Sequence, residues 1–354
     1  MKALNRNRQS LQVEDLTCSR ACGRGEEIDV LDLRCVSRDA ISDGGEWRSC
    51  TGGMRGLRIH NYEVVELLGE GAMGTVWLAR HTSTGRRAAI KFLRPELMQD
   101  KSAVACFLDE SRATRAIRHP NVVDVADAGM LCDGSTPYLM LEFLEGESLR
   151  MRLQRSRPLP IHEAVEITCQ IAAALDAAHQ LQIVHCDLKP ENLYLVPDQT
   201  VAEQVRLKVL DFGIARLYGN MNTASDSTKT GVLLGTPQYM SPEQCLGVPG
   251  TIDHRADIYA LGTILYEMLC GQVPFVSAGI GEILICQVFE APPSLRTRPP
   301  EIPESLDRVV LRALAKNPEE RFASMRDFAR AVREATEPGE SRAPRPPSSA
   351  IRPS

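Results

Sequence analysis

The periodicity of apolar residues changes along this chain of 354 residues, and that change constrains the fold more than any other feature. Before about residue 143, short runs rich in branched and aromatic residues alternate with glycine-bearing turns, which predicts an antiparallel sheet. The three clearest runs are 62–68, 75–80 and 88–93. One helix is predicted within this part, at 102–118, because its apolar residues recur at helical spacing. Helical spacing is strong at 161–181 and dominates after residue 256, so we expect an α+β protein with two lobes.

The two ends of the chain lack this patterning. Residues 1–58 mix charged residues with Ser and Gly, and residues 335–354 are rich in Pro, Ser and Arg. Neither end has the apolar content that a packed core requires, so we expect both to be disordered. The domain between them is expected to span 59–334, with a small lobe at about 59–143 and a large lobe at about 144–334.

The N-terminal segment contains four cysteines, which raise the alternative of a zinc site. Cys18, Cys22, Cys35 and Cys50 are separated by 3, 12 and 14 residues, and these spacings match no compact ligand pair well. A plain extension is therefore favoured, and Met54 as the true start of the protein is a further alternative.

Composition argues against several classes of protein. A formal net charge of -5 disfavours a nucleic-acid partner. No apolar run approaches the roughly 20 residues that span a bilayer, and no signal-peptide core follows the N-terminal charges, so no membrane partner is expected. The 11 cysteines lack the regular spacing of a disulfide framework. These features predict a cytoplasmic protein with reduced thiols.

A glycine-rich loop lies between the first two predicted strands. Its sequence is Gly69-Glu70-Gly71-Ala72-Met73-Gly74-Thr75-Val76. Glycines allow a backbone to approach phosphate oxygens closely. A dinucleotide-binding loop of similar spacing would have to open a helix, whereas a strand is predicted here after Gly74. The remaining alternative is a glycine hairpin without a ligand.

The next predicted strand carries a lysine at its centre, Lys91. Its neighbours Ile90 and Phe92 are expected to point to one face of the sheet, so Lys91 points to the opposite face. Glu110 on the following helix is the expected ion-pair partner, in preference to Asp109. Taken singly, a strand lysine and a helical glutamate are most often exposed surface charges.

The strongest chemical signal is the segment His185-Cys186-Asp187-Leu188-Lys189-Pro190-Glu191-Asn192, which precedes Asp211-Phe212-Gly213. Pro190 disfavours a helix here, so Asp187, Lys189 and Asn192 can converge from a loop. Phosphoryl transfer needs these groups: a carboxylate to orient a hydroxyl, a cation to offset phosphate charge, and oxygen ligands for Mg²⁺. Their order and spacing, together with Lys91 upstream, make coincidence improbable.

These motifs resemble the eukaryotic-type (Hanks-type) Ser/Thr protein kinase family, in its bacterial branch, over about residues 60–334. The resemblance implies a bilobed protein kinase fold that binds ATP with Mg²⁺ (or Mn²⁺) between its lobes. It implies that Asp187 and Lys189 are catalytic and that Asn192 and Asp211 hold the metal. The ATP site that it implies comprises Gly69, Glu70, Gly71, Ala72, Met73, Gly74, Val76, Ala89, Lys91, Glu110, Glu142 and Leu144.

Other segments extend the resemblance into the large lobe. Residues 235–243 resemble the end of the activation segment, Asp257 resembles the residue that braces the catalytic loop, and Arg321 resembles the partner of Glu243. Lys189 and Thr236 favour Ser/Thr over Tyr specificity by the same analogy. Protein substrates are the partners implied, with transient self-association for autophosphorylation.

The chain departs from the family pattern at Cys186. Many members have Arg at this position, where it binds a phosphorylated activation loop, and a thiol cannot make that charge-assisted bond. Thr228 and Thr230 lie where such kinases autophosphorylate, and Arg216 offers a partial anion pocket. We therefore expect this chain to depend only weakly on loop phosphorylation.

Two other functions compete with a protein kinase. A pseudokinase scaffold is disfavoured because every residue that the chemistry needs is present. A small-molecule phosphotransferase of related fold, such as an aminoglycoside or choline kinase, is disfavoured by residues 235–243, which resemble a peptide-docking loop.

Overall fold

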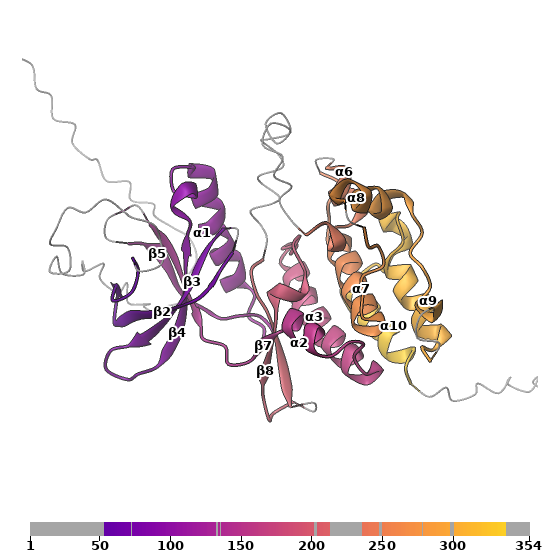
Figure 1. The fold of residues 1–354 in the computed structure, drawn as a ribbon, viewed down its shortest axis with the longest axis horizontal. Helices are drawn as coiled ribbons and strands as arrows, with labels where there is room; N and C mark the ends of the chain where they lie inside the picture. Colours follow the sequence, from indigo (N-terminus) through magenta and orange to yellow (C-terminus); the bar gives the residue numbers. More distant parts are fainter. Residues whose placement is uncertain are drawn as a thin grey trace, which may run out of the picture.

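The computed structural model describes residues 53–337 apart from several internal gaps, and it shows a β-sheet part and a helical part (Figure 1). The gaps are residues 72, 132–133, 135, 202–203, 213–235, 248–249, 278 and 298–300. The first part contains β1 (Arg58–Ile59), β2 (Tyr62–Glu70), β3 (Gly74–His81), β4 (Arg87–Leu93), η2 (Pro95–Leu97), α1 (Lys101–Ala116), β5 (Val125–Met130) and β6 (Pro137–Glu142). The second contains β7 (Glu147–Ser148), α2 (Leu149–Arg155), α3 (Ile161–Gln180), η3 (Pro190–Asn192), β8 (Leu193–Pro197), β9 (Val205–Val209), η4 (Pro237–Tyr239), α6 (Pro242–Leu246), α7 (Arg255–Cys270), α8 (Ile280–Phe289), η5 (Leu295–Thr297), α9 (Glu304–Ala313), η6 (Pro318–Glu320) and α10 (Met325–Glu334).

The small lobe is built on one antiparallel sheet with the order β1-β2-β3-β4-β6-β5. The alternation along β4 divides its side chains between two faces, as period-2 geometry requires. Ile90 and Phe92 join the apolar cluster around Trp77, whereas Leu93 packs with Phe107 of α1. Helix α1 begins at an Asp100 N-cap, whose carboxylate accepts the N–H groups of residues 102 and 103. The predicted strands and the predicted helix of this lobe are therefore confirmed.

Packing in the small lobe begins before the first strand. Met54 and Leu57 are partly buried against the apolar cluster that contains Val64 and Ile90, and the Gly56 N–H donates to the Val64 carbonyl at 2.8 Å. The packed part thus includes residues that the sequence had assigned to the extension ending at residue 58.

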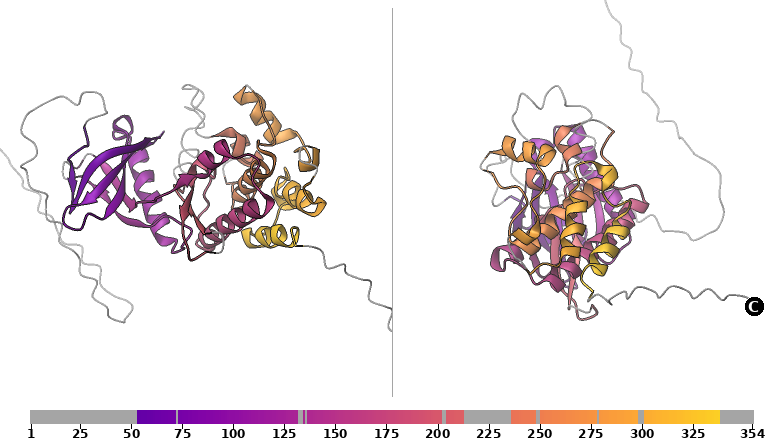
Figure 2. Two further views of the ribbon diagram at one scale, coloured as in Figure 1. Left: turned by 60° about the horizontal axis from the view of Figure 1, so that its bottom comes forward. Right: turned by 90° about the vertical axis from the view of Figure 1, so that its right-hand side faces the viewer.

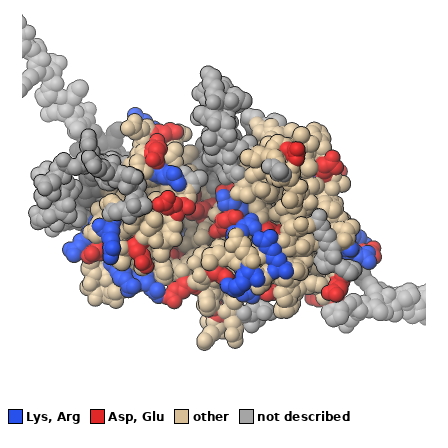
Figure 3. All heavy atoms as spheres, in the orientation of Figure 1, with Lys and Arg blue, Asp and Glu red and all other residues tan. Residues whose placement is uncertain are grey.

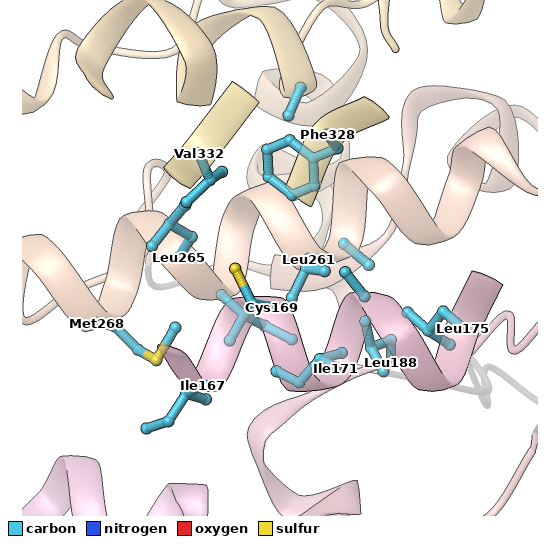
Figure 4. Packing of buried hydrophobic residues seen from close by; sticks show 14 of the residues in the cluster. Ile167, Cys169, Ile171, Leu175, Leu188, Leu261, Leu265, Met268, Phe328 and Val332 are labelled. Carbon is cyan, nitrogen blue, oxygen red and sulfur yellow. The ribbon is translucent and has the colours of Figure 1, made fainter. Parts of the chain in front are cut away.

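The large lobe is organised around α3 and α7, which cross in its core. Figure 4 shows Ile171 and Leu175 of α3 in one apolar cluster with Leu261 and Leu265 of α7 and Phe328 of α10. These side chains are at most 2 % exposed, and burial of this kind is the main source of stability for such helices. No helix in the part of the chain that the structure describes has the length and apolar character to span a bilayer.

A small sheet of order β7-β8-β9 lies on the side of the large lobe next to the small lobe, as the views in Figures 1 and 2 agree. Strand β9 also contacts the segment that follows α1, through a parallel bridge between Val122 and Val209. The Asn121 side chain donates to the Leu207 carbonyl at 2.8 Å, and the Val209 N–H donates to the Asn121 carbonyl at the same distance. The backbone of the large lobe is thereby joined to the small lobe directly before residue 211.

Candidate active site

The glycine loop connects β2 to β3, and its three glycines differ in what the fold requires of them. A Cβ on Gly74 would lie 2.0 Å from the Phe92 carbonyl oxygen, so the close approach of β3 and β4 demands glycine there. A Cβ on Gly69 would meet nothing within 4 Å, and one on Gly71 only the Gly74 carbonyl at 3.9 Å. The fold alone therefore does not explain glycine at positions 69 and 71. Ala72 lies outside the described residues.

Lys91 lies at the centre of β4 and is 7 % exposed. Its Nζ is 2.7 Å from Asp211 Oδ1, in the large lobe, and 3.7 Å from Glu110 Oε1, in α1. The structure thus places Glu110 beside Lys91, while Asp109 pairs with Arg112 at the surface. The nearer partner, Asp211, was not expected from the sequence, which had assigned it to a metal ion alone.

Burial and mutual charge set the proton affinities of these three groups. Burial by itself would lower the pKa of Lys91, but the charges of Asp211 and Glu110 raise it above its ordinary value. For Asp211, burial acts to raise the pKa, and the contact with Lys91 outweighs it, so the pKa is lowered. Burial raises the pKa of Glu110 to about 7, since the more distant Lys91 offsets it only in part. Lys91 and Asp211 are charged at neutral pH, and Glu110 titrates there.

The loop before η3 brings three of the predicted site residues together. Lys189 Nζ lies 2.9 Å from Asp187 Oδ2, and the Asn192 side chain donates to the Asp187 carbonyl at 2.9 Å. The Asp187 N–H in turn donates to His185 Nδ1 at 3.3 Å. Because Nδ1 accepts, Nε2 of His185 donates to the Leu210 carbonyl at 3.1 Å, and burial lowers the pKa of this histidine. A neutral imidazole therefore ties the loop to the residue before Asp211.

A buried carboxylate, Asp257 at the start of α7, fixes the backbone of this loop. Its two oxygens accept the N–H groups of His185 at 2.9 Å and Cys186 at 3.0 Å, and His179 Nε2 lies 2.8 Å from Oδ2. Burial acts to raise the pKa of Asp257, and these hydrogen bonds reverse the effect and lower it. The predicted contact of Asp257 with the catalytic loop is confirmed. This partner of His179 was not predicted from the sequence, since 78 residues separate it from Asp257.

Cys186 has a φ of 62°, in the left-handed region that non-glycine residues rarely adopt. Besides the bond from its N–H to Asp257, its carbonyl accepts the Gln244 side chain of α6 at 2.8 Å. Contacts on both sides of the residue thus hold this backbone conformation. Asp211, with a φ of 45°, is the second residue of the site in this region. Strained backbone of this kind persists only where surrounding contacts determine it.

The residues assigned to the adenine end of the nucleotide site lie on strands of the small lobe and in the segment that follows β6. Ala89 of β4 pairs with Leu141 of β6, and Val76 of β3 pairs with Lys91. Glu142 ends β6, and its carboxylate accepts Lys208 Nζ at 2.6 Å and the Asp124 N–H at 2.8 Å. Its side chain therefore joins β6 to β9. Leu144 follows two residues later and is half-buried.

The end of the predicted activation segment is held by a buried ion pair. Arg321, whose side chain is fully buried, donates to both carboxylate oxygens of Glu243, at 2.7 and 2.8 Å. The predicted pairing of these residues, 78 positions apart, is confirmed. Ser241 begins α6 with a capping box to Gln244. Thr228, Thr230 and Arg216 lie outside the described residues.

Comparisons with known proteins agree on one family. The model of the protein kinase domain matches residues 62–332. Serine/threonine-protein kinase Pkn1 of Myxococcus xanthus is 38% identical over 318 residues, which cover 88% of this chain and 44% of Pkn1. Serine/threonine-protein kinase pkn3 of the same organism is 40% identical over 271 residues, 76% of this chain and 49% of pkn3. The chain thus spans less than half the length of these curated relatives.

A solved structure agrees as well. The crystal structure of the Mycobacterium tuberculosis PknI kinase domain superposes with a TM-score of 0.60 at 28% identity, covering 79% of this chain and 98% of that one. Family model, curated relatives and fold all describe the same two-lobed unit. This chain therefore belongs to the protein kinase family, in the branch of the bacterial Hanks-type serine/threonine kinases.

Proposed function

We propose that this chain transfers the γ-phosphate of ATP to serine and threonine hydroxyls of proteins. The observation that carries the proposal is the meeting of the two lobes at Lys91, 2.7 Å from Asp211 and 3.7 Å from Glu110. When one of the two carboxylates binds a metal ion instead, the buried lysine can bind phosphate oxygens in its place. Members of this family use ATP with a divalent metal ion in this way.

The loop residues supply the acceptor side of the reaction. Asp187 orients the substrate hydroxyl and receives its proton, and Lys189, at 2.9 Å from Asp187, offsets negative charge on the transferring phosphoryl group. Because phosphoryl transfer needs little covalent chemistry from the protein, fixed positions matter most. Asp257 and His185 provide them by holding the loop backbone through hydrogen bonds.

Asn192 and Asp211 fit the metal ion that the family employs. The Asn192 amide nitrogen is bound to the Asp187 carbonyl, so its oxygen is the atom directed to a ligand. Amide and carboxylate oxygens are the donors that Mg²⁺ and Mn²⁺ accept. Among the described residues no group of three or more His, Cys, Asp or Glu side chains could hold a metal by itself. Two protein ligands suit Mg²⁺, which takes its others from phosphates and water, and which would neutralise phosphate charge when bound.

The nucleotide lies, in this proposal, between the glycine loop and the segment after β6. Gly69 and Gly71, which the fold itself does not require, allow the loop of Glu70, Ala72 and Met73 to approach the phosphates. Val76 and Ala89 form the apolar wall of the adenine site, and the backbone from Glu142 to Leu144 supplies its polar contacts.

The proposed partners are protein substrates and, transiently during autophosphorylation, a second copy of this chain. The proposed location is the cytoplasm. The similarity to the serine/threonine-protein kinases Pkn1 and pkn3 supports a serine/threonine kinase, and the anchored segment from Thr236 to Glu243 supports a protein substrate. An aminoglycoside or choline kinase remains the alternative among enzymes, and a pseudokinase the alternative among binding proteins.

The test is incubation with labelled ATP and Mg²⁺ in the presence of a generic protein and, separately, a panel of aminoglycosides. We expect label on serine and threonine of the generic protein, and none with the isosteric variant Asp187→Asn. Asp198→Asn, a change in the turn between β8 and β9, is the matched control and should retain the wild-type rate. Transfer to an aminoglycoside alone, or ATP binding without transfer, would overturn the proposal.

A further inference from the structure

A second cation in the large lobe is held between two carboxylates, and the reaction described above does not use it. Arg150 of α2 donates from Nε to Glu191 Oε1 and from Nη1 to Glu267 Oε1, both at 2.8 Å. Its Nη2 donates to the Tyr239 hydroxyl at 2.5 Å, and that hydroxyl donates to the other Glu267 oxygen. All three guanidinium nitrogens are therefore bound. We call Glu191, Glu267 and Tyr239 the acidic site.

The acidic site is assembled from segments that border the reaction centre. Glu191 lies in η3, between Lys189 and Asn192, and Tyr239 lies in η4, at the end of the predicted activation segment. Glu267 lies in α7, the helix whose first turn carries Asp257. A protein that presents a hydroxyl to Asp187 must therefore pass close to this site.

The site is open to solvent on one side only. Glu267 is buried, with a side chain 3 % exposed, whereas the Glu191 side chain is 44 % exposed and that of Arg150 is 21 % exposed. Burial and then the Glu267 carboxylate raise the pKa of Tyr239, so its hydroxyl remains a hydrogen-bond donor to Glu267. Without Arg150, two carboxylates would share a partly buried space without a cation, and such a space attracts a guanidinium group.

The other arginines of α2 show that this arrangement is specific to Arg150. Arg155 binds both oxygens of Glu147 at 2.7 Å, and Arg152 binds Glu163 at 2.6 Å. Among the described residues, neither Arg152 nor Arg155 makes a hydrogen bond to the catalytic loop or to η4. On the face shown in Figure 3, basic side chains gather over the middle of the molecule beside acidic ones.

We propose that Arg150 is a specificity-determining residue: it fills, from within the chain, an acidic site that would otherwise bind an arginine of the substrate protein. The kinase accordingly does not select substrates with arginine close to the phosphorylated residue. The inference rests on the proposed function, because it concerns the protein substrate of that same reaction. Removal of Arg150 should create a preference for arginine that the natural enzyme lacks.

The kinetic test compares peptides that carry one serine acceptor and a single arginine, moved one position at a time, with the all-alanine parent. Wild type and the control Arg155→Ala should show kcat/KM for every arginine peptide within a few-fold of the parent. For Arg150→Ala, at least one arginine position should raise kcat/KM by about tenfold or more. The additional change Glu191→Gln should reduce that gain. Equal peptide preferences in Arg150→Ala and wild type would overturn the proposal.

Wild type alone can also contradict the inference. If it prefers arginine at one position by about tenfold, and Glu191→Gln removes the preference, then a substrate arginine displaces Arg150 and the site is not closed. A wild type that phosphorylates no peptide or protein would instead contradict the proposed function, and the binding test below would still decide the inference.

The binding test needs no phosphotransfer. Ethylguanidinium, which matches the end of the removed side chain, should raise the melting temperature of Arg150→Ala but not of wild type or Arg155→Ala. Ethylammonium serves as the control cation, and it should give a smaller shift because it cannot bind both carboxylates through a fork. No shift with ethylguanidinium would overturn the proposal. If Arg150→Ala does not fold, Arg150→Met retains the apolar stem; failure of both variants to fold would show that Arg150 has a structural role only.

Discussion

Lys91 and Arg150 occupy comparable positions in the two lobes, since each is a single cation between two carboxylates from different segments. Lys91 is shared unevenly, at 2.7 Å from Asp211 and 3.7 Å from Glu110. Arg150 is shared evenly, at 2.8 Å from both Glu191 and Glu267, and the Tyr239 hydroxyl binds its remaining nitrogen. The two sites therefore differ in how completely the protein itself satisfies the cation.

This difference follows from the chemistry of the two side chains. An ammonium group is a compact charge with three rotatable donors, so it can exchange one oxygen ligand for another. A guanidinium group is a planar fork whose donors point in fixed directions, and a complete set of partners holds it in one geometry. The small-lobe site is suited to receive phosphate oxygens, and the large-lobe site is suited to remain closed.

The largest effect is expected for Lys91→Met. The substitution removes the cation that would bind phosphate oxygens, so kcat/KM should fall by about a thousandfold, as for other electrostatic catalytic groups. The measurement is the initial rate on a generic protein, with circular dichroism to verify the fold. Lys91→Arg is the control for charge: a guanidinium keeps the charge but not the exchangeable geometry, so it should also fail. Near-normal turnover in either variant would remove the distinction between the two cations.

A smaller effect, a change of about tenfold in kcat/KM, is expected from pH. Its origin is Glu110, because burial raises the pKa of this carboxyl group to about 7. Glu110 holds Lys91 in place only when its own carboxyl group is ionised. The value of kcat/KM for ATP should therefore rise between pH 6 and 8 with an apparent pKa near 7. Glu110→Gln should abolish this rise. Since the folded pKa lies above the unfolded one, the same group favours the folded state most below about pH 4.5 and loses this contribution through about pH 7. A flat profile in wild type would show that Glu110 stays ionised and that Lys91 is held by both carboxylates.

The activation loop should have a smaller influence still, because a third cation that many family members have is absent at Cys186. Phosphate on the loop normally gains roughly 1.5–3 kcal/mol from each charge-assisted bond, and none can form with a thiol. The double variant Thr228→Ala/Thr230→Ala should therefore retain activity within about tenfold of wild type, roughly 1.4 kcal/mol in barrier. Phosphatase-treated wild type provides the comparison. A hundredfold loss in both forms would mean that another cation, such as Arg216, binds the phosphate.

The smallest effect is expected from removal of the two chain ends, because neither end is expected to contact Lys91 or Arg150. Removal of residues 1–52 and 338–354 should leave activity and melting temperature nearly unchanged. Removal through residue 58 should lower the melting temperature, because burial of Met54 and Leu57 contributes on the order of 1–2 kcal/mol. Calorimetry of both truncations gives the comparison. Loss of activity in the shorter truncation, or zinc released from the full chain, would assign the N-terminal segment a structural or regulatory role.

The sequence by itself determined the fold class and the order of the motifs. Strand and helix periods are local properties, so the alternation along this strand predicted correctly that Lys91 lies on the face opposite to Ile90 and Phe92. Pro190 and the neighbouring polar residues predicted a loop for the same reason, since backbone restrictions act within a few residues.

Only the tertiary structure decided which polar groups meet. Asp211 binds Lys91 across 120 residues, and Arg150 binds Glu267 across 117. His179 was given no partner from the sequence, yet it contacts Asp257. A carboxylate carries no local signature of the distant cation that it will bind, because the pairing depends on how lobes and helices pack. Burial then gives each pairing its strength, since a buried charge must be matched and an exposed one need not be.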